Sequence, residues 1–72
     1  MESYTINVNN NKFTLKALRG NNDWTITQTA KRVGVAPQTW SNWENKKTFP
    51  NVPQILKIEK IFNVEYKDIN FF

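Results

Sequence analysis

Residues 37–45 carry four polar, uncharged side chains at helical spacing, namely Gln38, Ser41, Asn42 and Asn45. If a helix begins at Pro37, a pitch of 3.6 residues per turn places these four on one side and Trp40, Trp43 and Glu44 on the other. Solvated helix faces are usually rich in lysine and glutamate, whereas amides and hydroxyls can form hydrogen bonds with base edges in a DNA major groove. The pattern indicates a DNA-reading helix. The alternative is an ordinary solvated row of amides.

The elements around this face predict a helix-turn-helix over residues 25–45. Thr25 is suited to cap the first helix, and Ala30 is small enough to let the second helix cross closely. Gly34 follows at the turn, where a positive φ costs glycine little. Pro37 suits the first position of the second helix, because its missing N–H would have no partner there in any case. We expect the two tryptophans of this helix to face the core.

The N-terminal residues predict an extended segment. Residues 3–9 alternate apolar and polar side chains, which is typical of a short strand. A hairpin with residues 12–13 would complete an N-terminal arm over residues 1–13.

The remainder of the chain predicts further helices. Thr14 is a candidate N-cap for a first helix, and Asn51 is a candidate N-cap for a fourth. Residues 51–70 are expected to form the C-terminal helices, of which the last, short one covers residues 65–70. The expected fold is all-α: one compact five-helix bundle over residues 1–72, with a short N-terminal extended arm or strand.

The positive charge is concentrated in one part of the chain. The 72 residues have a formal net charge of +4. Residues 12–47 hold seven basic and two acidic residues, whereas residues 48–72 hold three of each. A polyanion such as nucleic acid is the expected partner of the basic part, through phosphate contacts. A mildly basic, solvated surface would have the same composition.

Other functional classes are disfavoured by what the chain lacks. It contains no cysteine and no histidine, which excludes disulfides and the usual zinc-ligand sets. It has no apolar run long enough to span a bilayer and no secretion-like signal in Met1–Asn11. It has no paired carboxylates in a recognisable cleft motif. We therefore expect a soluble, cytoplasmic, non-enzymatic protein without a metal, cofactor, membrane or small-molecule partner.

Residues 15–69 resemble the helix-turn-helix domain of the lambda-repressor and Cro-like transcriptional regulators of phages and bacteria. The residues that carry the resemblance are Leu18, Arg19, Thr25, Ala30, Gly34, Val35, Thr39, Ser41, Trp43, Glu44, Asn45, Pro50, Asn63 and Val64. The resemblance implies a five-helix bundle whose third helix enters the major groove. It also implies base contacts from Pro37, Gln38 and Asn42; Ser41 is a further candidate, for a base or for the DNA backbone.

The resemblance further implies phosphate contacts and one structural ion pair. Positions that approach phosphate are matched by Asn45, Lys46 and Lys47, and further phosphate candidates are Thr25, Lys31 and Arg32. Arg19 and Glu44 match a pair that often forms a structural salt bridge. Three departures stand out: Ile26 replaces a phosphate-contacting glutamine, and Lys46 stands where glycine is common. Pro37 replaces a polar side chain at a base-contacting position, where it could offer only apolar contact, such as with a thymine methyl.

Apolar residues near the C-terminus suggest self-association. Ile61 points away from the apolar stripe expected on the fourth helix, and Phe71 and Phe72 follow the last helix. A homodimer through the C-terminal third would place two reading helices about 34 Å apart on a palindromic operator. The alternative is that Phe71 folds back onto the core. Glu59 falls within the apolar stripe and is expected to need a cation partner or exposure.

Together these observations predict a small sequence-specific regulator, a Cro-like repressor of a bacterial host or its phage. The alternatives are a protein-interaction module, such as an antitoxin or a regulator that no longer binds DNA, and a binder of single-stranded nucleic acid or RNA.

Overall fold

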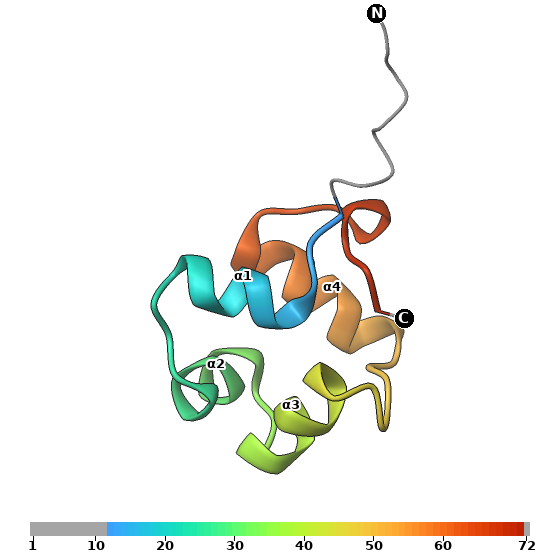
Figure 1. Ribbon diagram of the computed structural model, residues 1–72. Helices are drawn as coiled ribbons and strands as arrows, with labels where there is room; N and C mark the ends of the chain where they lie inside the picture. Colours follow the sequence, from blue (N-terminus) through green and yellow to red (C-terminus); the bar gives the residue numbers. More distant parts are fainter. Residues whose placement is uncertain (1–11, 72) are drawn as a thin grey trace, which may run out of the picture.

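A computed structural model describes residues 12–71 of the chain. The elements are α1 (Leu15–Asn21), α2 (Ile26–Val33), α3 (Pro37–Glu44), α4 (Val52–Phe62) and a 3-10 turn, η2 (Tyr66–Asp68). Figure 1 shows α2 and α3 together at the lower end of the molecule, with α1 and α4 above them. The strand expected over residues 3–9, its hairpin and Phe72 lie outside the described residues.

Helix starts follow from side-chain caps encoded nearby in the sequence. Thr25 accepts from the backbone N–H of Gln28, whose side chain accepts from the N–H of Thr25. Asn51 and Gln54 make the same reciprocal pair at α4. Each pair satisfies two backbone donors that a helix leaves unpaired at its start. The predicted starts of α2 and α4 are therefore confirmed.

The ends of α2 and α4 require left-handed backbone. Gly34 has φ +86° and its N–H donates to the carbonyl of Ala30 at 2.8 Å. A Cβ at this position would lie 3.2 Å from Nζ of Lys57, the mobile end of a side chain that can move aside, so the backbone angle is what favours glycine here. Asn63 ends α4 at φ +54°, a conformation that asparagine tolerates.

The C-terminal part differs from the predicted fifth helix. A helix was expected over residues 65–70. Among the described residues after α4, only the three residues of η2 are helical, and residues 65 and 69 on either side of it are extended. Ile69 forms a parallel bridge with Phe13: the Phe13 N–H donates to Asp68 at 2.8 Å, and the Asn70 N–H donates to Phe13 at 2.7 Å. A pairing distant in sequence replaces the local helix, so the described bundle has four α-helices rather than five.

The core is built around the inner face of α3. Trp40 and Ile58 are 0% exposed, and the Trp40 ring lies 5.7 Å from that of Trp43 and 6.1 Å from that of Phe62. Thr29 is also 0% exposed, and its hydroxyl donates to the carbonyl of Thr25. The other members of the core cluster are Leu15, Leu18, Ala30, Val33, Ile69 and Phe71. The indoles thus hold the inner side of α3, as its helical spacing predicts, and the polar row is left outside.

An ion pair fixes α3 against α1. The guanidinium of Arg19 donates to both carboxylate oxygens of Glu44, at 2.6 and 3.2 Å, and to the carbonyl of Trp24 at 3.0 Å. The indole N–H of Trp40 donates to the same carboxylate. Hydrogen bonding to Glu44 raises the pKa of Arg19 above its ordinary value. The Arg19 guanidinium therefore stays positively charged at neutral and moderately alkaline pH.

Replacing Glu44 with alanine should lower the free energy of unfolding by about 3 kcal/mol, because it strands the Arg19 charge and the Trp40 donor in a mostly buried site. Glu44→Gln keeps an acceptor for the indole and should cost less. Urea unfolding monitored by tryptophan fluorescence measures both. Equal stability of Glu44→Ala and the unchanged chain would contradict a structural role for the pair.

Candidate nucleic-acid interface

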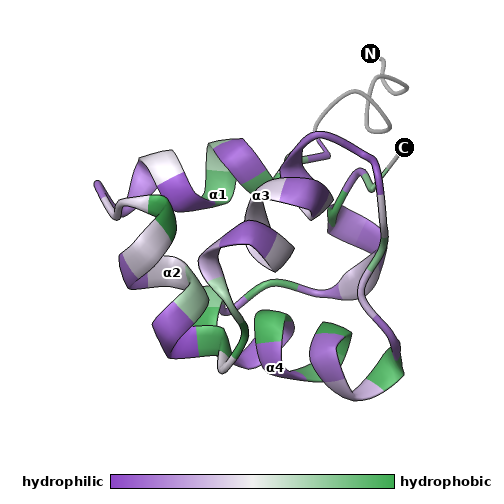
Figure 2. Cartoon of the chain, turned by 90° about the horizontal axis from the view of Figure 1, so that it is seen from below, coloured by the Kyte–Doolittle hydropathy of each residue, from purple (hydrophilic) through white to green (hydrophobic). Residues whose placement is uncertain are grey.

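The outer face of α3 carries the predicted base-contacting residues. Pro37 and Gln38 are exposed, and Ser41 and Asn42 are half-buried. In Figure 1 the helix lies at the lower edge of the molecule, and in Figure 2, seen from below, its ribbon is mostly purple and white. The four residues are accessible, polar apart from Pro37, and uncharged.

Two amides on this face are joined to each other. Nε2 of Gln38 donates to Oδ1 of Asn42 at 2.9 Å, one helical turn along. This hydrogen bond does not use the Gln38 side-chain carbonyl, the second Gln38 amide hydrogen or the two hydrogens of the Asn42 amide. An acceptor beside a donor matches the N6 and N7 edge of adenine, whereas the Asn42 donors match acceptors such as N7 and O6 of guanine or O4 of thymine. The pair forms a partly ordered hydrogen-bonding unit.

Asn45 closes α3 rather than pointing away from it. Its Nδ2 donates to the carbonyl of Ser41 at 3.0 Å and lies 3.4 Å from the Ser41 hydroxyl. The backbone N–H of Asn45 also donates to the Ser41 carbonyl. In this arrangement the side-chain donors that a phosphate contact would need are directed into the helix end.

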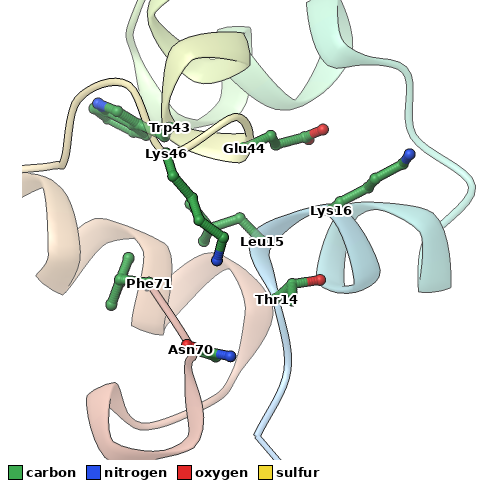
Figure 3. Close-up of a pocket in the computed structure, with 8 residues that line it drawn as sticks. All are labelled: Thr14, Leu15, Lys16, Trp43, Glu44, Lys46, Asn70 and Phe71. Carbon is green, nitrogen blue, oxygen red and sulfur yellow. The ribbon is translucent and has the colours of Figure 1, made fainter.

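The turn after α3 presents two exposed lysines. Lys46 has φ +61°, in the left-handed region that glycine occupies most readily, so the departure at this position carries backbone strain. The next N–H, of Lys47, donates to the carbonyl of Asn42 at 2.9 Å and closes the turn. Figure 3 shows the Lys46 side chain extending toward Leu15 of α1, across a hollow of about 150 Å³ that Lys16 also lines. Lys46 and Lys47 therefore lie directly after the C-terminal end of α3.

The phosphate-contact candidates on α2 and at its N-cap differ in the contacts that their side chains make within the protein. Lys31 is exposed. Arg32 places its guanidinium 4.3 Å from the ring centre of Trp24, a cation–π contact, and Trp24 packs in turn on Phe62. The Thr25 hydroxyl is used as the helix cap. Of these three, Lys31 has the fewest internal contacts. The sequence analysis did not single out Trp24, because this residue lies between α1 and α2, where no helical period predicts the direction of a side chain.

Of the apolar residues proposed for a dimer interface, Ile61 and Phe71 lie within the described part of the chain, and both pack on the core. Phe71 is 7% exposed and its ring stacks on Tyr66, so it folds back onto the core, as the alternative held. Ile61 also packs against the core and does not point away from it. Glu59 is half-buried, and its carboxylate accepts from the backbone N–H of Tyr66 at 2.6 Å. The carboxylate, for which a cation partner or exposure was expected, is thus partly exposed and accepts a hydrogen bond from a backbone donor.

Residues 12–71 contain no cluster of three or more acidic side chains able to hold a metal ion. None of their helices has the length and apolar character needed to cross a bilayer.

The chain was compared with known proteins. A family model described as a helix-turn-helix domain matches residues 14–69, which include all four α-helices and η2. No curated protein and no solved structure matches the chain. The chain therefore belongs to the helix-turn-helix domain family, which indicates a small DNA-binding regulator.

Proposed function

We propose that this protein binds duplex DNA in a sequence-specific manner with α3 in the major groove, as a Cro-like repressor in a bacterial cytoplasm. The observation that carries the proposal is the outer face of α3. It is accessible to solvent, uncharged and bears the Gln38–Asn42 amide pair, while Trp40 and Trp43 anchor the opposite face in the core. Such a helix can approach base edges without unsatisfied charge.

Charge supports the same surface. The two lysines of the turn after α3 and Lys31 on α2 are exposed, and residues 12–47 have a net charge of +5. Phosphate contacts from these cations would orient the domain on the duplex but would carry no sequence information. We assign phosphate contacts to Lys46, Lys47 and Lys31 in preference to Asn45, Thr25 and Arg32, because the side chains of the latter three are engaged within the protein.

A single copy offers few base contacts. Two copies on a palindromic operator, with reading helices about 34 Å apart, would double them and increase discrimination. We therefore propose a homodimer, at least on DNA. An electrophoretic mobility shift with a random duplex pool at low salt tests the whole proposal. A chain that retains no duplex would overturn it in favour of a protein-interaction module.

Gln38→Ala should relax sequence preference by about 1–3 kcal/mol at one base pair, because it removes the acceptor and donor suited to adenine. Selection of bound sites from a random duplex library, run in parallel for the variant and the unchanged chain, measures the change. Alanine is a good helix former, so α3 should persist. Identical selected sites from both chains would contradict base reading by Gln38.

Lys47→Ala should weaken binding to all duplexes alike and reduce the slope of log affinity against log salt by about one. The matched control is Lys67→Ala, an exposed lysine on η2, at the opposite end of the molecule from α3 in Figure 1. Titrations at several salt concentrations distinguish the two variants. An equal effect from both lysines would contradict a local phosphate contact.

Lys46→Gly should raise the stability of the protein and weaken its binding to duplex DNA. Relief of the left-handed strain, less the entropy that glycine loses on folding, should raise the free energy of unfolding by about 0.5–1 kcal/mol. Loss of the cation should weaken duplex binding in the same variant. Urea unfolding and mobility shifts measure the two effects. Unchanged binding would remove Lys46 from the phosphate-contacting set.

A further inference from the structure

The apolar stripe of α4 extends beyond the part that the core covers. Ile58 is 0% exposed and Phe62 packs against the core, yet Val52 and Leu56 are 67% and 58% exposed. Residues four apart in a helix lie above one another, so these two exposed side chains form a short apolar row along α4. Neighbouring large apolar groups left in water usually mark a contact site.

The apolar row adjoins a hollow in the surface. This open depression has a volume of about 330 Å³, and we name its lining the α4 surface: Val52, Ile55, Leu56, Glu59 and Tyr66. The Tyr66 ring stacks on Phe71 at 5.6 Å, and the Glu59 carboxylate accepts a hydrogen bond from the backbone N–H of Tyr66. These contacts fix one side of the hollow within the fold. The α4 surface can therefore receive apolar side chains that arrive in a row.

The described part of the chain begins close to this surface. The N–H of Phe13 donates to the carbonyl of Asp68 at 2.8 Å, and its carbonyl accepts from the N–H of Asn70 at 2.7 Å. These bonds hold Phe13 beside η2, which carries Tyr66 of the α4 surface. In Figure 1 the blue start of the described chain lies beside the red turn of η2. The preceding residues, 1–11, are therefore attached close to the α4 surface.

These preceding residues carry apolar side chains at the period of a strand. Tyr4, Ile6 and Val8 alternate with Thr5 and Asn7. In an extended conformation the three apolar side chains would point to one side, about 6.6 Å apart. Residues four apart along a helix face are about 6 Å apart. An extended segment can thus place its apolar side chains in step with the apolar row of α4.

We propose that residues 4–8 lie extended along the α4 surface and cover it. The length of chain suits this path, because the four residues from Val8 to Lys12 reach at most about 14 Å. Residues 4–8 would span about 13 Å more, and the part of α4 from Val52 to Glu59 is about 10 Å long. The segment can therefore follow the whole of the α4 surface. The inference goes beyond the proposed function and does not depend on it.

Charge and attachment favour this segment as the occupant. Residues 3–11 contain no charged side chain, and residues 48–72 hold three basic and three acidic residues. Neither part has a net charge that would select a charged partner or repel the other. A segment joined to the domain by a short linker also has an effective concentration in the millimolar range. A small apolar contact therefore suffices to hold it, whereas a separate molecule would need a larger contact to bind from dilute solution.

The covered surface would be closed to other macromolecules. Residues 4–8 would act as a strap, and another protein could use the apolar row of α4 only after displacing them. The strap would lie on α4 and leave the outer face of α3 accessible.

The test is a spin label on the segment of the full chain, free of DNA. The chain contains no cysteine, so Asn7→Cys creates a single labelling site. This position lies on the opposite side of an extended segment from Ile6 and its apolar neighbours, so the label should leave the contact intact. A nitroxide there should broaden the amide NMR signals of residues 52–56 strongly, and those at the outer face of α3 much less.

Two further substitutions in the labelled chain separate a contact from mere nearness. Ile6→Asn removes the central apolar side chain of the segment and should abolish the broadening at residues 52–56. The matched control is Thr5→Asn, which changes the opposite side of the extended segment and should keep the broadening. Leu56→Asn should release the segment from the other partner, and because Leu56 is 58% exposed this variant should fold.

Signals of residues 52–56 that stay sharp in the labelled chain, or that are broadened equally after Ile6→Asn, would overturn the inference. Broadening concentrated on the outer face of α3 would also overturn it. A mixture of spin-labelled chains with isotope-labelled chains that carry no nitroxide reports contacts between copies. Equal broadening of α4 in that mixture would overturn the inference, because the occupant would then be another copy. These measurements contain no DNA, so their failure is distinct from a failure to bind duplex.

Discussion

The position of the outer face of α3 depends on one carboxylate. Glu44, the last residue of α3, accepts hydrogen bonds from Arg19 of α1 and from the Trp40 indole one turn back. Arg19 also holds the carbonyl of Trp24, just before α2. The three helices that set the orientation of the polar row therefore share one charged junction. Its geometry matters more than its net energy, because a buried ion pair contributes little stability but forces its neighbours into register.

The parts of the fold that could be predicted from the sequence are those decided within a few residues. Thr25 and Asn51 are followed three positions later by glutamine, and that spacing encodes a reciprocal cap without any distant contact. Gly34 marks a left-handed turn for equally local reasons. The placement of Trp40 on the inner face required only the helical period.

The parts that could not be predicted depend on pairings between distant segments. Residues near the C-terminus have the composition of a helix, but Ile69 is held extended by Phe13, more than fifty positions earlier. The apolar residues of α4 likewise extend around much of the helix, and the sequence alone does not show that the core covers Ile58, Ile61 and Phe62 and leaves Leu56 exposed, because that depends on where the other helices lie. Phe71 returns to the core for the same kind of reason, because it joins a cluster that includes Leu15 and Trp43, both far from it in sequence.

Attraction to DNA and discrimination among sequences make opposite demands on a surface, and in the function proposed for this chain they would be divided between different residues. A cation attracts every duplex alike, whereas an amide contributes only where its donors and acceptors match a base edge. The outer face of α3 is uncharged, and the lysines stand in the turn that follows it and on α2. Because Gln38 and Asn42 already hydrogen bond to each other, contact with a base requires less ordering of flexible side chains. Salt would then act mainly on affinity, through the lysines, and leave the choice of sequence to the amides.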